Sequence, residues 1–153
     1  MTVEVGVMFA CSGFLLAVLW MDLIFDIQVR ASHDPEVPER VLASIAGYYH
    51  RATTTSRPMS RLIAAVMVIL LAALIIRGVR GVDPVWLLAS SAVLVGAPIL
   101  LAGIRTVPNA VRLGHRRDAA AEQSRLARSI YRDHLLCFGG VVAFLVLWLS
   151  RVW

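Results

Sequence analysis

Four long apolar runs constrain the fold of this chain more than any other feature. They cover residues 5–29, 59–76, 84–107 and 130–149. A helix of about 20 residues crosses the roughly 30 Å of hydrocarbon in a typical bilayer. The runs do not alternate apolar and polar residues as the strands of a membrane barrel do. The sequence therefore predicts an all-α polytopic membrane protein, a single antiparallel bundle of four transmembrane helices.

The overall composition excludes several other classes of protein. Of the 153 residues, 59% are hydrophobic and only 16% are charged. A soluble domain of this length needs more charged residues to cover its surface. We therefore exclude a soluble enzyme, a disordered tail and a disulfide-stabilised scaffold. The first run is interpreted as a retained helix, because it lacks a basic leader and ends in acidic residues instead of a cleavage site.

The arginines predict how the helices are oriented. All fifteen basic residues are arginine, and the net charge is +5. Twelve arginines lie in residues 30–61 and 105–132, whereas the other side of the membrane has only three, Arg77, Arg80 and Arg151. Basic residues gather in cytoplasmic loops. We therefore expect a multi-pass protein of the bacterial inner (plasma) membrane with both termini outside and both long loops cytoplasmic, and no nucleic-acid partner.

The two cytoplasmic segments have helical patterns of their own. In residues 37–51, apolar side chains recur at three- and four-residue steps, which predicts an interfacial helix with Tyr48 and Tyr49 at headgroup depth. Residues 116–132 are expected to extend the fourth helix below the membrane. Within the third helix, Pro98 is a predicted kink and Pro108 a predicted boundary or kink. The small residues Gly96, Gly103, Gly139 and Gly140 are expected to allow close contact between helices.

Two aspartates inside the first helix are the strongest candidates for function. Asp22 and Asp26 are one turn apart and share a helix face. A carboxylate at membrane depth is unfavourable, so it should face the bundle interior and find a partner. One interpretation is a proton, cation or metal site, or the anchor of a polar ligand. The alternative is a structural ion pair, formed by Asp26 with Arg30 and by Asp22 with an arginine such as Arg61 or Arg105.

The histidines offer a possible general base. Those at positions 33, 50, 115 and 134 all lie on the predicted cytoplasmic side. His134 lies in the first turns of the fourth membrane helix, close to Tyr131 and Asp133, where it could act as a base or a metal ligand. No His-x-x-His or Glu-x-x-His pair occurs, so we predict no metal site. The identity of any cofactor stays open.

The end of the third helix and the start of the fourth carry two short motifs. Residues 106–113 read TVPNAVRL, and residues 128–134 read RSIYRDH. This part of the chain resembles the anthrone-oxygenase-like family of small four-helix membrane proteins. The resemblance implies oxidation or binding of a lipophilic aromatic molecule, with Asn109, Arg112 and His134 as the residues concerned.

We therefore expect a polar cluster at the cytoplasmic ends of the helices. The candidate catalytic residues are Asp22, Asp26 and His134, and the candidate ligand-binding residues are His50, Asn109, Arg112 and Tyr131. The first hypothesis is a site that binds or oxidises a lipophilic small molecule, so whether the protein is an enzyme is open. The second is a structural or accessory subunit of a homo-oligomer or membrane complex. The third is a proton- or ion-coupled transporter that uses Asp22.

Overall fold

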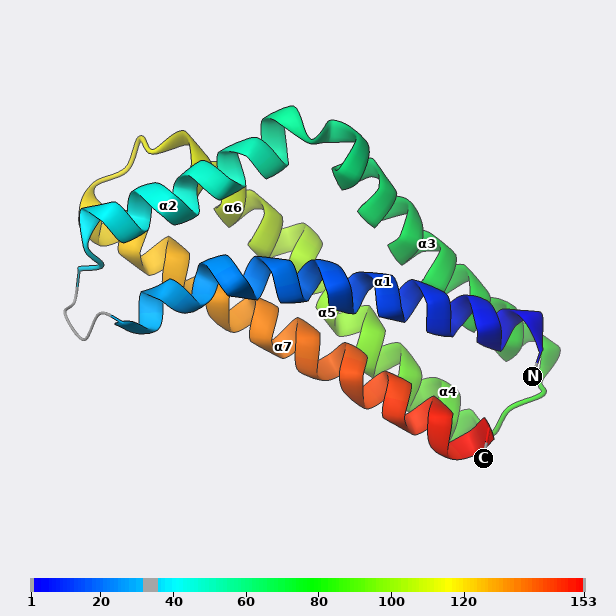
Figure 1. Ribbon diagram of the computed structural model, residues 1–153. Helices are drawn as coiled ribbons and strands as arrows, with labels where there is room; N and C mark the ends of the chain where they lie inside the picture. Colours follow the sequence, from blue (N-terminus) through cyan, green and yellow to red (C-terminus); the bar gives the residue numbers. More distant parts are fainter. Residues whose placement is uncertain (1, 32–35, 153) are drawn as a thin grey trace.

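The computed structural model describes residues 2–31 and 36–152, and every regular element among them is helical. His33 lies outside the described residues. Figure 1 shows the helices as a long bundle in which the first and last described residues lie at the same end. We call this the terminal end, and we call the opposite end, formed by α2 and the α6–α7 connection, the loop end. The predicted all-α four-helix bundle is confirmed.

Four helical segments are long and apolar enough to cross a membrane. The first contains α1 (Val3–Asp26) and the 3₁₀ turn η1 (Ile27–Ala31), and the second is α3 (Arg57–Arg80). The third is built from α4 (Val85–Ser91), the π-turn η3 (Ala92–Gly96), α5 (Ala97–Leu101), the π-turn η4 (Ala102–Thr106) and α6 (Val107–His115). The fourth is α7 (Ala120–Val152), whose 33 residues give a length of about 50 Å.

The two prolines of the third span each follow a π-turn. Pro98 follows η3, and Pro108 follows η4. Proline has no N–H, and its ring clashes with the carbonyl four residues earlier. A π-turn shifts the hydrogen-bond register locally, which lets the helix continue past the proline. The predicted irregularities are therefore present at both positions, as register shifts within a continuous span.

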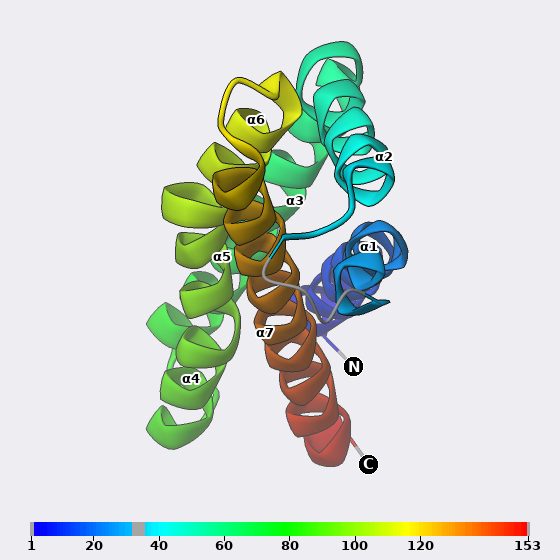
Figure 2. The same ribbon diagram turned by 90° about the vertical axis from the view of Figure 1, so that its left-hand side faces the viewer.

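α2 (Glu39–His50) is the amphipathic helix that the sequence predicted between the first two spans. Its buried face packs on α6 and on the extended start of α7, as Figure 2 shows in the view along the bundle. Contact with α6 depends on Gly114, where an added Cβ would lie 2.9 Å from the His50 backbone nitrogen. Another π-turn, η2 (Arg51–Thr55), leads from α2 into α3.

Close packing of the third and fourth spans depends on Gly140. A Cβ at this position would lie 2.7 Å from the Leu94 carbonyl oxygen, the carbonyl to which Pro98 cannot donate a hydrogen bond. The sequence predicted close contacts at Gly96, Gly103 and Gly139 as well. That prediction is wrong, because a Cβ at any of these three would meet nothing within 4 Å.

The interior has two apolar clusters, one at each end of the bundle. The terminal-end cluster includes Met8, Leu70, Phe144 and Trp148. The loop-end cluster consists of buried side chains from η1, α2, α6, α7 and the segment before α2: Val29, Val37, Leu42, Ile45, Ala46, Tyr49, Ala110, Leu113, Leu126, Ala127 and Ile130. Buried polar residues of α1 and α7 lie beside the loop-end cluster, and they include two of the aspartates and a histidine.

Candidate functional site

A histidine bracketed by two aspartates forms the centre of the polar region. The His134 Nδ1 of α7 lies 2.6 Å from Oδ2 of Asp26, and its Nε2 lies 3.8 Å from Oδ2 of Asp22. Because Asp22 and Asp26 are one turn apart on α1, a single imidazole packed against this helix can reach both carboxylates. The sequence predicted that the two aspartates would face the bundle interior and grouped His134 with them, and the structure brings the three residues together.

Two tyrosines of α2 complete this arrangement. The Tyr48 hydroxyl donates to Oδ1 of Asp22, and the Tyr49 hydroxyl donates to Oδ1 of Asp26, each over 2.6 Å. The Tyr49 hydroxyl oxygen also lies 3.4 Å from His134 Nδ1. We refer to Asp22, Asp26, Tyr48, Tyr49 and His134 as the His134 centre. It joins α1, α2 and α7 through charged and hydroxyl groups.

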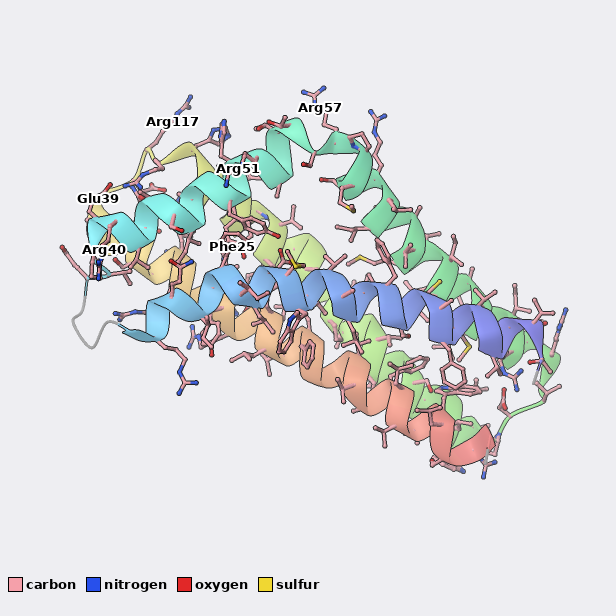
Figure 3. The ribbon with its side chains drawn as sticks, viewed as in Figure 1. Phe25, Glu39, Arg40, Arg51, Arg57 and Arg117 are labelled. Atoms are coloured by element: carbon pink, nitrogen blue, oxygen red, sulfur yellow. The ribbon has the colours of Figure 1, made fainter. Side chains whose placement is uncertain are left out.

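The two aspartates differ in their access to the surface. Asp26 is fully buried, whereas the Asp22 side chain is 16% exposed. Phe25 stacks on Tyr48 with ring centroids 4.1 Å apart, and Figure 3 places Phe25 between α1 and α2. A molecule approaching the centre would therefore meet Asp22 and this aromatic pair first, with Asp26 behind them.

Both tyrosines are held in the protonated form. Burial is the main cause that raises the pKa of the Tyr49 phenol, and the charge of Asp26 adds to it. Burial also raises the pKa of the Tyr48 phenol, and Asp22 adds to that shift. A protonated phenol can donate to a carboxylate, so these shifts agree with the two short hydrogen bonds.

The arrangement fixes the orientation of the imidazole. Asp26 accepts the Nδ1–H of His134, so the neutral ring presents its unprotonated Nε2 towards Asp22. The protonated ring would instead place an imidazolium between two carboxylates. A single proton can thus be held by His134 or by Asp22, which gives the centre the elements of an acid–base pair.

The arginine pairs that the sequence offered to the two aspartates are not formed among the described residues. Arg105 instead contacts Asp133, with its Nε 3.3 Å from Oδ2, and donates to the Ser129 hydroxyl. Asp133 is itself buried and also accepts from the Thr106 hydroxyl. Arg105 therefore pairs with Asp133, whereas Asp22 and Asp26 contact the histidine and the tyrosines.

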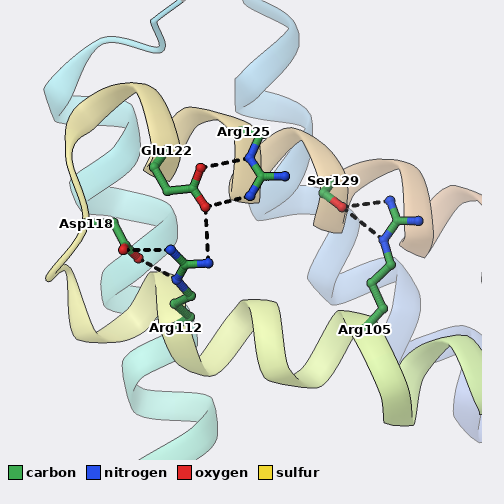
Figure 4. A network of polar contacts seen from close by, with 6 residues as sticks. All are labelled: Arg105, Arg112, Asp118, Glu122, Arg125 and Ser129. Carbon is green, nitrogen blue, oxygen red and sulfur yellow. Dashed lines mark hydrogen bonds and ion pairs between the residues drawn. The ribbon is translucent and has the colours of Figure 1, made fainter.

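Four other candidate residues lie apart from the His134 centre. Arg112 binds Asp118 and Glu122 at the loop end, as Figure 4 shows. His50 is exposed, and its ring faces that of His115 with centroids 6.4 Å apart. Tyr131 packs against the loop-end cluster, and Asn109 is half-buried on α6. The cluster expected from the sequence is thus divided between two places.

Sequence reasoning placed Tyr48 and Tyr49 at the membrane surface, and their contacts with the aspartates were missed. A signal was present, because Tyr49 follows Leu42 and Ile45 on the apolar face of α2. A tyrosine on a buried face needs a partner for its hydroxyl. That partner could not be named, because the sequence does not define the position of α2 along α1.

Two hollows on the surface lie outside the centre. One of about 340 Å³ is lined by Ala121, Arg125, Arg128 and Arg132. The other, of about 360 Å³, is lined by six residues of α6 and the connection to α7: Pro108, Val111, Arg112, His115, Arg117 and Asp118. Neither hollow reaches Asp22 or His134. Among the described residues, no three His, Cys, Asp or Glu side chains are grouped to hold a metal ion.

The chain was also compared with known proteins. No family model, no curated protein and no solved structure matches the chain. Its function therefore has to be inferred from the His134 centre and its surroundings.

Proposed function

We propose that the protein is an integral membrane protein that binds the polar end of a lipophilic small molecule beside Asp22 and removes a proton from it. The observation that carries this proposal is the bracketed histidine. Its Nδ1 lies 2.6 Å from a buried carboxylate, and its Nε2 faces a second carboxylate that is partly exposed. A carboxylate that holds Nδ1–H leaves Nε2 available as a base, as in many acid–base sites.

The chemistry assigns different roles to the two aspartates. Asp26 is a positioning residue, because it contacts His134 from a fully buried position. Asp22 is the group that an incoming ligand can reach. It accepts the ligand's proton directly, or relays it to Nε2 of His134. Tyr48 holds the Asp22 carboxylate in place through its hydrogen bond.

The substrate class follows from the surroundings and from the resemblance of residues 106–134 to the anthrone-oxygenase-like family. A lipophilic aromatic ring can lie beside Phe25 and Tyr48, with an acidic C–H or O–H group at Asp22. For an anthrone, removal of a C–H proton gives a carbanion, and this carbon forms a bond to O₂, which gives a hydroperoxide once the proton is returned to the oxygen. Loss of the second C–H proton and cleavage of the O–O bond then release one water and leave a ketone, so one anthrone and one O₂ yield one quinone and one water.

A direct test uses 1,8-dihydroxyanthrone with the full chain in detergent. We expect the protein to accelerate formation of the anthraquinone, measured by absorbance, and Asp22→Asn and His134→Gln to lower this rate by about 100-fold or more, the usual range for loss of a general base. Glu39→Gln is the matched control, since it removes an exposed carboxylate at the loop end. Equal rates for Asp22→Asn and Glu39→Gln would contradict the proposal.

A second candidate function is that of a non-enzymatic subunit in a homo-oligomer or membrane complex. It is favoured by the fact that both aspartates have partners and that neither hollow reaches them. In that case Asp26→Asn would change stability or oligomeric state, and the anthrone would not react faster than in buffer. Transport through Asp22 is less well supported, because a transporter needs a water path and the terminal-end cluster is apolar.

We also propose that the protein lies in a bacterial inner membrane with its loop end in the cytoplasm and both termini outside. The support is the distribution of twelve arginines against three. Labelling of intact cells with a membrane-impermeant maleimide tests this orientation. We expect Val82→Cys to react in intact cells, and Arg117→Cys to react only after permeabilisation. The reverse pattern would contradict the orientation.

A further inference from the structure

Two histidines from different helices lie side by side at the loop end. His50 is the last residue of α2 and His115 is the last residue of α6, and their ring centroids are 6.4 Å apart. Both side chains are exposed, and neither ring has a hydrogen bond or an ion pair within the described part of the chain. Their nitrogens are therefore available to a ligand from outside the protein.

The backbones that carry these two rings are in direct contact. A Cβ on Gly114, the residue before His115, would lie 2.9 Å from the backbone nitrogen of His50 and 3.1 Å from its Cα. Tyr49 and Leu113, which also precede the two histidines, are buried in the loop-end cluster. The distance between the rings is thus set by two packed helices and not by a flexible loop, which is how a precise binding site is built.

The distance between the rings suits a single metal ion held by both. An imidazole nitrogen binds Zn²⁺ at about 2.0–2.1 Å, and the ring centre lies roughly 1.2 Å further away, so two ligating rings have centres about 5–6.5 Å apart, depending on the angle at the metal. The rings of His50 and His115 fall within this range. Because both side chains are exposed, rotation can turn a nitrogen of each towards one ion while α2 and α6 stay in place.

The surrounding charges limit the kind of cation that can bind. Arg51 follows His50, and Arg117 lies two residues beyond His115; both are exposed, and Figure 3 shows Arg117 pointing away from the bundle. The C-terminal end of α6 places its partial negative charge at His115. A cation must therefore gain its binding free energy from coordination bonds to imidazole. This favours Zn²⁺ and Cu²⁺, which prefer nitrogen ligands, over Mg²⁺ and Ca²⁺.

Solvent has to complete the coordination of such an ion. Asp118 lines the same hollow of about 360 Å³ as His115, but both of its oxygens accept from Arg112. It is therefore not free to act as a third ligand. Two imidazoles and water differ from the closed set of four protein ligands in a structural zinc site, so the ion should exchange with the solution.

We infer that His50 and His115 form a binding site for a divalent transition-metal ion of the Zn²⁺ or Cu²⁺ class, which connects the end of α2 to the end of α6. The site shares no residue with the His134 centre, and the inference does not depend on the proposed acid–base function. Because Tyr48 and Tyr49 directly precede His50, a bound ion also fixes the helix end that carries these two tyrosines.

Electron paramagnetic resonance with Cu²⁺ tests the site. The untagged full chain in detergent receives one equivalent of Cu²⁺ in a buffer that does not bind metals. We expect a spectrum with two imidazole nitrogens on the ion. His50→Ala and His115→Ala should each show fewer than two nitrogens, and each should lower the Cu²⁺ affinity by about 10-fold or more, because loss of a group that only supports a ligand already has an effect of this size.

His134→Gln is the matched control, since it removes a histidine of the other site. We expect it to keep both nitrogens and the Cu²⁺ affinity of the unmodified chain. Loss of Cu²⁺ from His134→Gln but not from His115→Ala would place the ion at the His134 centre and overturn the inference. One nitrogen in the unmodified chain, or an unchanged affinity in either His50→Ala or His115→Ala, would also overturn it. Folding of each variant is checked by its far-UV circular dichroism.

Thermal unfolding with Zn²⁺ tests the connection between the helices. An ion that binds only the folded chain stabilises it by mass action. We expect Zn²⁺ at about 100 times its dissociation constant to raise the unfolding midpoint by about 5 °C or more, and to leave His115→Ala unchanged. Mg²⁺ at the same concentration should have no effect on either protein. No rise in the unmodified chain, an equal rise in His115→Ala, or an equal effect of Mg²⁺ would overturn the inference.

Discussion

The contact between Asp26 and His134 stabilises a fully buried carboxylate inside this bundle. The carboxylate accepts from the imidazole and from the Tyr49 hydroxyl, so its two oxygens each have a donor. A buried charge without such partners is strongly unfavourable. The pair therefore has a structural effect whatever its chemical role.

The first prediction concerns this pair. His134→Leu leaves the Asp26 carboxylate buried without its main partner, and should lower the free energy of unfolding by about 3–5 kcal/mol. The double variant Asp26→Leu, His134→Leu should lose less than His134→Leu alone, because it removes both charged groups. Equilibrium unfolding in mixed micelles measures both values. A double variant that is less stable than His134→Leu would contradict this interpretation.

The second prediction concerns alkaline pH. The raised pKa of Tyr49 means that the folded protein keeps a proton that the unfolded chain loses above about pH 10. Stability should therefore fall as pH rises above 10, by up to about 1.4 kcal/mol per pH unit from this group. Tyr49→Phe removes that contribution, so its stability should fall less steeply over the same range. Parallel curves for the two proteins would contradict the buried position of the phenol.

At the scale of elements, close helix contacts depend on two glycines. Sequence reasoning named Gly140 among four candidates, and three of them have open space around them. Small residues allow close contact, but they do not show which face of a helix is used. Gly114, which the sequence did not single out, lies directly against the α2 backbone.

The third prediction compares two glycine substitutions. In Gly114→Ala, the added methyl group would lie 2.9 Å from the His50 nitrogen, so α2 has to move away from α6. We expect a loss of about 1–3 kcal/mol, the usual range for overpacking. Gly103→Ala is the control, because nothing lies within 4 Å of its Cβ position. Thermal unfolding of the two variants gives the comparison, and equal stabilities would contradict the close contact.

The helices themselves were largely predictable, whereas their mutual positions were not. Apolar length defines a span, and the three- and four-residue steps in residues 37–51 predicted α2. The prolines of the third span marked the places where its register changes. The contact of α2 with α1 depends on how the two helices are placed relative to each other, which no local pattern in either helix specifies. Tyr48 and Tyr49 were assigned to the membrane surface for this reason.

At the scale of the whole molecule, one end of the bundle is surrounded by lipid and the other end extends into water. The terminal-end cluster lies among the membrane spans, whereas the loop-end cluster includes α2, which is not one of them. Burial from water gains hydrophobic free energy, whereas burial from lipid gains only packing. The two clusters should therefore differ in what a deleted methyl group costs.

The fourth prediction uses two leucines with the same burial. Leu42 and Leu70 are both 0% exposed, one in each cluster. Leu42→Ala should lower stability by about 2–5 kcal/mol. Leu70→Ala should lose about 2 kcal/mol less, since its side chain exchanges protein contacts for lipid and not for water. Unfolding in bicelles measures both. Equal losses would mean that both clusters exclude the same solvent.

The candidate site was predictable in part at this scale too. Asp22, Asp26 and His134 could be named because charged groups within apolar runs are conspicuous. Arg112 and Asn109 were grouped with them because all lie towards the same end of the bundle. The depth of a residue along the bundle does not define on which side of a helix it lies, and Arg112 binds Asp118 of the α6–α7 connection.

A contact at the terminal end has a consequence for how the protein is made. Arg77 of α3 is bound by Asp83 from the following turn and by the Thr2 hydroxyl, and its guanidinium lies 5.2 Å from the ring centre of Trp148. Three parts of the chain thus meet at one cation. The ribosome must have passed Asp83 before the first two partners exist together, and must have reached Trp148 before the third does. The N-terminal end of the first span can therefore be held at Arg77 only after the second span and the turn that follows it have been synthesised.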